Sequence, residues 1–130
     1  MSHPASLEQL YRDAIYEVDL PGQTVVFRIG EAARAGLTVP LTLVTAFNPG
    51  TSRPCEEINR AANRRLQAEI TRRGWPCFPA RGRDATGTHV EPSFAITGIS
   101  REDALALGRE FSQAAIVFVD SDRVSLLWCE

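Results

Sequence analysis

The stretch TAFNPGTSRPCEEINRAANRRL, residues 45–66, joins the end of a strand, a tight turn and the start of a helix. The apolar and β-branched residues 41–47 are typical of a strand buried on both faces, and the Asn-Pro-Gly sequence at 48–50 ends it. A proline in the first turn and two following glutamates favour a helix over residues 54–73, which Gly74 terminates. No motif in the chain specifies a reaction, so we look for a site at this junction.

Two asparagines interrupt the apolar face of this helix. Asn59 falls in the middle of the face and Asn63 at its edge. A buried amide without partners costs roughly 1–3 kcal/mol, so both side chains need hydrogen bonds. Either Asn59 fixes the backbone of the preceding turn, or the two asparagines line a polar pocket together with Asn48. The apolar face that we expect to be buried consists of Cys55, Ile58, Ala62, Leu66 and Ile70.

Length and composition indicate one globular domain over residues 1–130. Of its 130 residues, 44% are hydrophobic and 23% charged, which is ordinary for such a domain. No apolar run approaches the roughly 20 residues of a membrane span, and the N-terminus lacks the basic and apolar regions of a signal peptide. Three cysteines without close spacing favour reduced thiols, and hence a cytoplasmic protein that does not contact a membrane.

The charge of the chain is unevenly distributed. A net charge of −2 argues against avid nonspecific binding to nucleic acid. Residues 53–83 nevertheless contain eight arginines and three glutamates, while the rest of the chain contains six arginines and thirteen acids. The basic centre is therefore either a solvated helix face or a surface for an acidic protein or a nucleic acid.

The other elements follow from apolar runs separated by turn residues. Residues 75–79 contain two prolines, so we expect a short strand at the sheet edge, followed by a polar loop over 80–89. Ser100 and Asp103 form a helix-capping pattern. The expected elements are a helix at 7–14, strands at 15–18, 24–29 and 41–47, a helix at 54–73, strands at 75–79 and 93–99, a helix at 101–111, and strands at 114–119 and 124–128.

This order predicts an α+β fold. From residue 41 onward it contains β-α-β-β-α-β, the pattern of ferredoxin-like folds. We therefore expect a two-layer sandwich whose mostly antiparallel sheet is extended by an N-terminal hairpin and preceded by a helical segment over 1–14. An exposed last strand, ending in Leu126, Leu127 and Trp128, would allow a homodimer through the sheet edge.

Five motifs in a fixed order carry a resemblance to a known family. They are TAFNP (45–49), NRAANRRL (59–66), GRD (82–84), EPSFAITGIS (91–100) and FSQAAIVF (111–118). In this combination the chain resembles a bacterial family of small cytoplasmic proteins of unknown function, DUF3293, from about Val44 to Trp128, which gives a family-like core over 41–128. The resemblance implies no activity. It implies that six polar residues belong to a family pattern: Asn48, Asn59, Asn63, Glu91, Ser93 and Gln113.

These residues and the nearby arginines suggest a site for a small anion. Strand ends beside helix starts present free N–H groups, which bind anions. We expect a small binding or regulatory domain for an anionic ligand such as a nucleotide or a phosphorylated metabolite. The candidate ligand-binding residues are Asn48, Asn59, Asn63, Arg81, Arg83, Glu91, Ser93 and Gln113.

Other interpretations of single residues stay open. Glu91 can pair with Arg81 or Arg83 to hold the loop, and Gln113 can satisfy the carbonyls at a helix end. A hydrolase would use Glu91 or His89 as its acid or base. Cys55 is either a packed thiol or the nucleophile of a pair with His89. The spacing of cysteines and histidines fits no metal site, and no cofactor motif is present.

Overall fold

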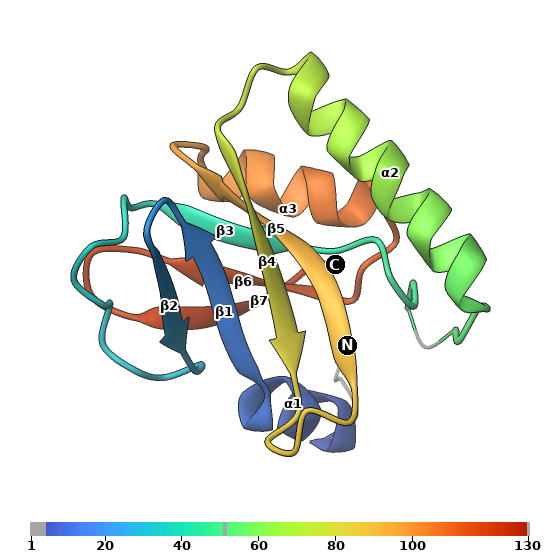
Figure 1. The fold of residues 1–130 in the computed structure, drawn as a ribbon, viewed down its shortest axis with the longest axis horizontal. Helices are drawn as coiled ribbons and strands as arrows, with labels where there is room; N and C mark the ends of the chain where they lie inside the picture. Colours follow the sequence, from blue (N-terminus) through green and yellow to red (C-terminus); the bar gives the residue numbers. More distant parts are fainter. Residues whose placement is uncertain (1–4, 51, 130) are drawn as a thin grey trace.

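The computed structural model describes residues 5–50 and 52–129, so residues 1–4 of the expected N-terminal segment lie outside the described part (Figure 1). Its helices are α1 (Ala5–Asp13), α2 (Glu56–Arg72) and α3 (Arg101–Glu110). The strands are β1 (Ile15–Leu20), β2 (Gln23–Phe27), β3 (Leu41–Val44), β4 (Cys77–Arg83), β5 (Val90–Thr97), β6 (Ala115–Val119) and β7 (Val124–Trp128). The mixed α+β class is thereby confirmed.

The seven strands form one sheet in the order β2-β1-β4-β5-β3-β6-β7. Each neighbouring pair is antiparallel, as expected for the sheet as a whole. Helices α2 and α3 cover one face, and α1 lies at the opposite side, near the ends of β4 and β5 (Figure 1). No helix in residues 5–50 and 52–129 is long and apolar enough to cross a membrane.

The sheet curls strongly, so the fold is more than a two-layer sandwich. The segment after β2 is hydrogen-bonded to β7, the strand at the opposite edge of the sheet. The Gly30 amide donates to the Val124 carbonyl at 2.8 Å, and the Val124 amide donates to the Glu31 carbonyl at 2.9 Å. Antiparallel sheets twist and coil, and seven strands accumulate enough curvature to form half a barrel. The expectation of a two-layer sandwich is therefore met only in part: the mostly antiparallel sheet and the mixed class are observed, but the sheet curls into half a barrel.

Hydrophobic clusters fill both faces of the curled sheet. All four residues of β3 are buried, because this central strand has apolar neighbours on each side. The cluster under α2 and α3 includes Val44, Leu66, Ile70, Ile96, Leu107, Ile116 and Phe118. The cluster inside the curl includes Tyr16, Val18, Phe27, Leu41, Leu43, Val117 and Val119.

Two elements differ from the sequence-based expectation. β4 lies between β1 and β5 rather than at an edge, and its residues 80–83 belong to the strand rather than to a loop. Pro76 precedes β4, and Pro79 is tolerated because β1 pairs only from Ala80 onward, so Pro79 has β5 alone as a ladder partner. The actual turn spans 84–89 and is closed by a 3.2 Å bond from the Asp84 amide to the His89 carbonyl.

The buried face of α2 is rotated relative to the expected one. Its buried residues are Asn59, Asn63, Leu66 and Ile70. Ile58 is 58% exposed, and Cys55 at the N-cap is also exposed, so both were wrongly placed in the apolar face. The two asparagines turn inward because their amides bind backbone groups at the end of β3. The capping prediction for α3 is confirmed: Ser100 Oγ accepts a 3.0 Å bond from the Asp103 amide.

Candidate functional site

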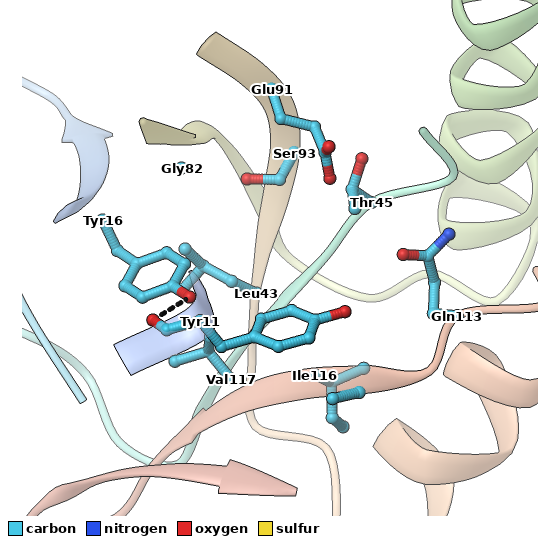
Figure 2. A pocket seen from close by; sticks show the side chains of 11 residues that line it. Tyr11, Tyr16, Leu43, Thr45, Gly82, Glu91, Ser93, Gln113, Ile116 and Val117 are labelled. Carbon is cyan, nitrogen blue, oxygen red and sulfur yellow. Dashed lines mark hydrogen bonds between the residues drawn. The ribbon is translucent and has the colours of Figure 1, made fainter. Parts of the chain in front are cut away.

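A pocket of about 60 Å³ lies inside the curl of the sheet, where Tyr11 of α1 faces the strands (Figure 2). Roughly one water fits in each 10–15 Å³ of such volume, so the pocket accommodates a group of a few heavy atoms. Its lining residues are Tyr11, Tyr16, Leu43, Thr45, Gly82, Glu91, Ser93, Gln113, Ala115, Ile116 and Val117.

The strand register explains why polar residues of β5 enter this pocket. Gly82 pairs with both Tyr16 and Glu91, and Ala80 pairs with Ser93, so these positions share the inner face of the sheet. The absence of a side chain at Gly82 leaves room for the tyrosine ring, since a Cβ there would stand 3.2 Å from its Cε1 atom.

Glu91 brings a half-buried carboxylate to the pocket. Asn48 Nδ2 donates to its Oε2 atom at 3.2 Å, and in the described part of the chain the carboxylate forms no ion pair. Burial raises the pKa of Glu91, while the Asn48 hydrogen bond and the more distant charge of the exposed Arg53 oppose that rise. The carboxylate is thus only weakly compensated.

The asparagines of α2 fix the turn after β3 and the start of β5 by hydrogen bonds. Asn59 Oδ1 accepts from the Asn48 amide at 2.9 Å, and Asn59 Nδ2 donates to Asn48 Oδ1 at 2.9 Å. Asn48 itself has a φ of 48°, a left-handed conformation that asparagine tolerates. Asn63 bonds the Ala46 amide at 2.7 Å and the Pro92 carbonyl at 3.0 Å. The interpretation that Asn59 fixes the turn is confirmed, and neither helix asparagine lines the pocket.

Ser93 places a hydroxyl in the pocket without a partner. The residue is 9% exposed, and none of the described residues gives Ser93 Oγ a hydrogen bond. The neighbouring hydroxyl of Thr45, in contrast, donates to the Pro92 carbonyl at 2.8 Å and accepts from the Phe47 amide at 3.1 Å. Ser93 Oγ therefore has hydrogen-bonding capacity to spare.

Gln113 contributes an acceptor from the junction of α3 and β6. Its Nε2 atom donates to the Phe47 carbonyl at 3.2 Å and to the Phe111 carbonyl at 3.3 Å. Phe111 is the C-cap of α3, so the expectation that Gln113 satisfies helix-end carbonyls is confirmed. With the nitrogen fixed in this way, Oε1 points toward the pocket (Figure 2).

Two tyrosines close the pocket on the side of α1. The Tyr16 hydroxyl donates to the Tyr11 carbonyl at 2.9 Å, which ties α1 to the sheet (Figure 2). The Tyr11 ring packs edge-on against Trp128, with ring centroids 5.9 Å apart. Burial, assisted by the charge of Glu91, raises the pKa of Tyr11 to about 12, so its hydroxyl stays neutral at physiological pH.

One known protein family has a model that matches this chain. The family model described as "Protein of unknown function (DUF3293)" matches residues 44–116, more than half of the chain. The chain belongs to the DUF3293 family. No curated protein and no solved structure matches it significantly. The DUF3293 match contains Glu91, Ser93 and Gln113, while both tyrosines of the pocket lie before it.

The two candidate arginines lie on the other face of the DUF3293 sheet. Arg81 stands opposite Glu17 in the β1–β4 register and binds it through Nε at 2.5 Å, while its Nη1 atom contacts Asp19 Oδ2 at 2.8 Å. Arg83 Nε contacts the same glutamate at 3.0 Å. The expectations that these arginines share a cleft with Glu91, or pair with it, are therefore wrong, because residues 81 and 83 alternate with the inward-facing Gly82.

The thiols and histidine of this DUF3293 chain are scattered. Cys55 is exposed rather than packed, and His89 is exposed in the turn after β4, where its amide donates to Asp84 Oδ1 at 3.3 Å. Within residues 5–50 and 52–129, no cluster of three or more histidine, cysteine, aspartate or glutamate residues is arranged to hold a metal ion. The pocket on the inner face is thus the strongest candidate site.

Part of this pocket is predicted by the sequence. The family pattern points to Glu91, Ser93 and Gln113, whereas Tyr11, Tyr16 and Thr45 were not among the predicted site residues. The alternation in β1 would have shown that Tyr16 faces inward with Val18. No local signal placed Tyr11 there, because its position depends on how α1 docks against the curled sheet.

Proposed function

We propose that this DUF3293 chain is a small ligand-binding or regulatory domain whose ligand occupies the pocket inside the curled sheet. The observation that carries this proposal is the buried, unpartnered hydroxyl of Ser93. Leaving a buried polar group unpaired costs roughly 1–3 kcal/mol, and an alanine would fill the same place without that cost. A bound ligand that hydrogen-bonds this hydroxyl accounts for its presence.

The surrounding groups support the same interpretation. Glu91 and Gln113 add a carboxylate and an amide oxygen, and the rest of the lining is mainly apolar or aromatic. A small, largely apolar pocket with a few converging polar groups is the usual form of a small-molecule site. The expected anionic ligand is not supported, because both arginines face the other side of the sheet and Glu91 would repel an anion.

Thermal unfolding against a panel of small compounds tests this proposal. A ligand at 100 times its dissociation constant stabilises the folded state by about 2.7 kcal/mol, which shifts the midpoint by several degrees. We expect a shift for at least one compound in the native chain and a smaller one in Ser93→Ala. Equal shifts in both proteins would place the ligand elsewhere, and a panel without any shift would contradict the proposal.

A second candidate function is an interaction module that uses α2. Arg64 and Arg65 are exposed on this helix, and no partner among the described residues forms an ion pair with either. They are available to an acidic protein or a nucleic acid. Binding that weakens steeply with salt and is lost in an Arg64→Ala, Arg65→Ala double variant would favour this function over the pocket.

An enzymatic role is the third candidate, favoured only by Glu91. Its raised pKa suits a general acid or base in a hydrolase, but no hydrogen bond links its carboxylate to the Ser93 hydroxyl in the described structure. His89, the other candidate, is exposed in a turn. Turnover that disappears in Glu91→Gln while stability is unchanged would establish this role.

The finer fold and location are part of the same proposal. We infer that β3, α2, β4, β5, α3 and β6 form a ferredoxin-like unit, which the local strand order β4-β5-β3-β6 supports. The odd number of cysteines, without close spacing in the sequence, supports a reducing, cytoplasmic setting. Dimerisation through β7 stays a prediction, supported by the position of this strand at the sheet edge.

A further inference from the structure

The described polar groups that line the pocket include acceptors but no cation. Glu91 provides a carboxylate, and Ser93 Oγ both accepts and donates. Gln113 has committed its Nε2 donors to two backbone carbonyls, so its Oε1 atom is the group left for a ligand. Figure 2 shows that oxygen directed toward the same space. Acceptors thus predominate among the polar groups of the pocket, whose remaining donors are the neutral hydroxyls of Ser93 and Tyr11.

The pocket also holds a weakly compensated negative charge. The Glu91 carboxylate receives one amide bond, from Asn48 at 3.2 Å, and no ion pair from the described residues. The charged group that acts on it is Arg53, which is exposed; Glu91 in turn raises the pKa of Tyr11 and Tyr16, which stay neutral. A desolvated carboxylate of this kind is stabilised by a cation that enters beside it.

Resting on the binding function proposed above, we propose that this pocket recognises a primary ammonium group. The three N–H donors of such a group match three acceptors: the Glu91 carboxylate, Gln113 Oε1 and Ser93 Oγ. The attached carbon atoms contact Leu43 and the ring of Tyr11, whose π face also attracts a cation. The volume of about 60 Å³ fits an ammonium with a short alkyl stem.

Three probes of similar size separate the classes of ligand: ethylammonium, ethanol and acetate. Each is added to the full chain at constant ionic strength, and NMR follows the Gln113 side-chain amide and the backbone amides of Ser93 and Ala115. Charge-assisted hydrogen bonds are worth roughly 1.5–3 kcal/mol, so ethylammonium should bind about tenfold or more tightly than ethanol. Acetate should cause no shift at these positions.

Two variants and one change of pH locate the binding. Glu91→Gln should weaken ethylammonium binding about tenfold or more, because the neutral amide removes the charge. Thr42→Val should bind as the native chain does, since Thr42 lies on the helix-covered face and outside the pocket lining. Lowering the pH to about 4 should weaken binding. The pKa of Glu91 lies above its ordinary value, so the carboxylate is protonated at that pH and loses its charge.

The possible failures are distinguishable. If ethanol or acetate binds at the pocket as tightly as ethylammonium, the ammonium class is wrong while the binding function stands. If ethylammonium binds equally well to Glu91→Gln, or shifts only residues outside the pocket, the inference is overturned as well. If none of the three probes shifts the lining resonances, and the thermal panel is also flat, both the inference and the binding function fail.

Discussion

Asn48 Nδ2 donates a 3.2 Å hydrogen bond to Glu91 Oε2 and thereby joins the turn after β3 to the pocket strand β5. The same asparagine is held by Asn59, which binds both its backbone amide and its side-chain oxygen at 2.9 Å. Helix α2 therefore positions a carboxylate that it does not touch.

Asn59→Ala should destabilise the fold and raise the pKa of Glu91. Loss of the Asn59 amide leaves the half-buried Asn48 N–H without its partner, which costs roughly 1–3 kcal/mol, measured by urea unfolding. The Glu91 pKa should rise further, because the Asn48 amide that lowers it loses its anchor. Asn63→Ala is the matched control: it should cost similar stability with a smaller effect on Glu91. Equal shifts of the Glu91 pKa in both variants would contradict the claim that Asn59 acts on Glu91 through Asn48.

Ser93→Ala and Thr42→Val test what the two unpaired hydroxyls do. Both Ser93 Oγ and Thr42 Oγ1 are buried without a partner among the described residues. In the free chain each substitution should raise the free energy of unfolding by up to roughly 1–3 kcal/mol, because it removes the cost of the unpaired hydroxyl. Only Ser93→Ala should reduce stabilisation by a pocket ligand. A loss of several kcal/mol in free Ser93→Ala would mean that the hydroxyl has a structural partner.

Glu91→Gln should change how stability depends on pH. The folded-state pKa of Glu91 is raised by burial above its ordinary value near 4.5, so the folded state holds this proton more tightly than the unfolded state. The contribution of Glu91 protonation to the free energy of unfolding is complete below pH 4.5 and is lost as the pH rises through the folded-state pKa. Urea unfolding across this window should show the variant gaining stability relative to the native chain as the pH increases. A constant difference would contradict the raised pKa.

Gly108→Ala should destabilise the packing of α3 against β6 and Cys129. A Cβ at this helix position would stand 2.7 Å from Cys129 Sγ and 2.9 Å from Ile116 Cγ2, closer than packed atoms approach. Overpacking of this kind costs roughly 1–3 kcal/mol. Adding Cys129→Ala should recover part of the loss, measured as a coupling free energy in a double-mutant cycle. Purely additive losses would mean that Cys129 is not the obstacle.

Local signals predicted the elements well. The helix expected at 54–73 is observed at Glu56–Arg72, and the last strand is found at its expected limits, Val124–Trp128. Both are bounded by residues with strong local preferences, a proline and a glycine for the helix and an aspartate-rich turn for the strand. The anchoring role of Asn59 was also predictable, because a buried amide must find partners close to its own helix start.

Long-range strand pairing determines which face of the sheet each side chain occupies, and local sequence signals do not show this. Arg81, Arg83 and Glu91 are close in sequence, but the β1–β4–β5 register sends the arginines to one face and Glu91 to the other. The curl of the sheet, which brings Tyr11 over the inner face, depends on the twist accumulated by seven strands. Neither property is encoded in a short window of sequence.

The most direct test is an NMR titration of the Glu91 side-chain carboxyl carbon, in the free chain and with saturating ethylammonium. We predict a pKa above the ordinary value in the free chain, which falls when the cation binds because the buried charge gains a partner. An ordinary pKa in the free chain would contradict the description of Glu91 as a half-buried, weakly compensated carboxylate. A raised pKa that ethylammonium leaves unchanged would contradict the ammonium site.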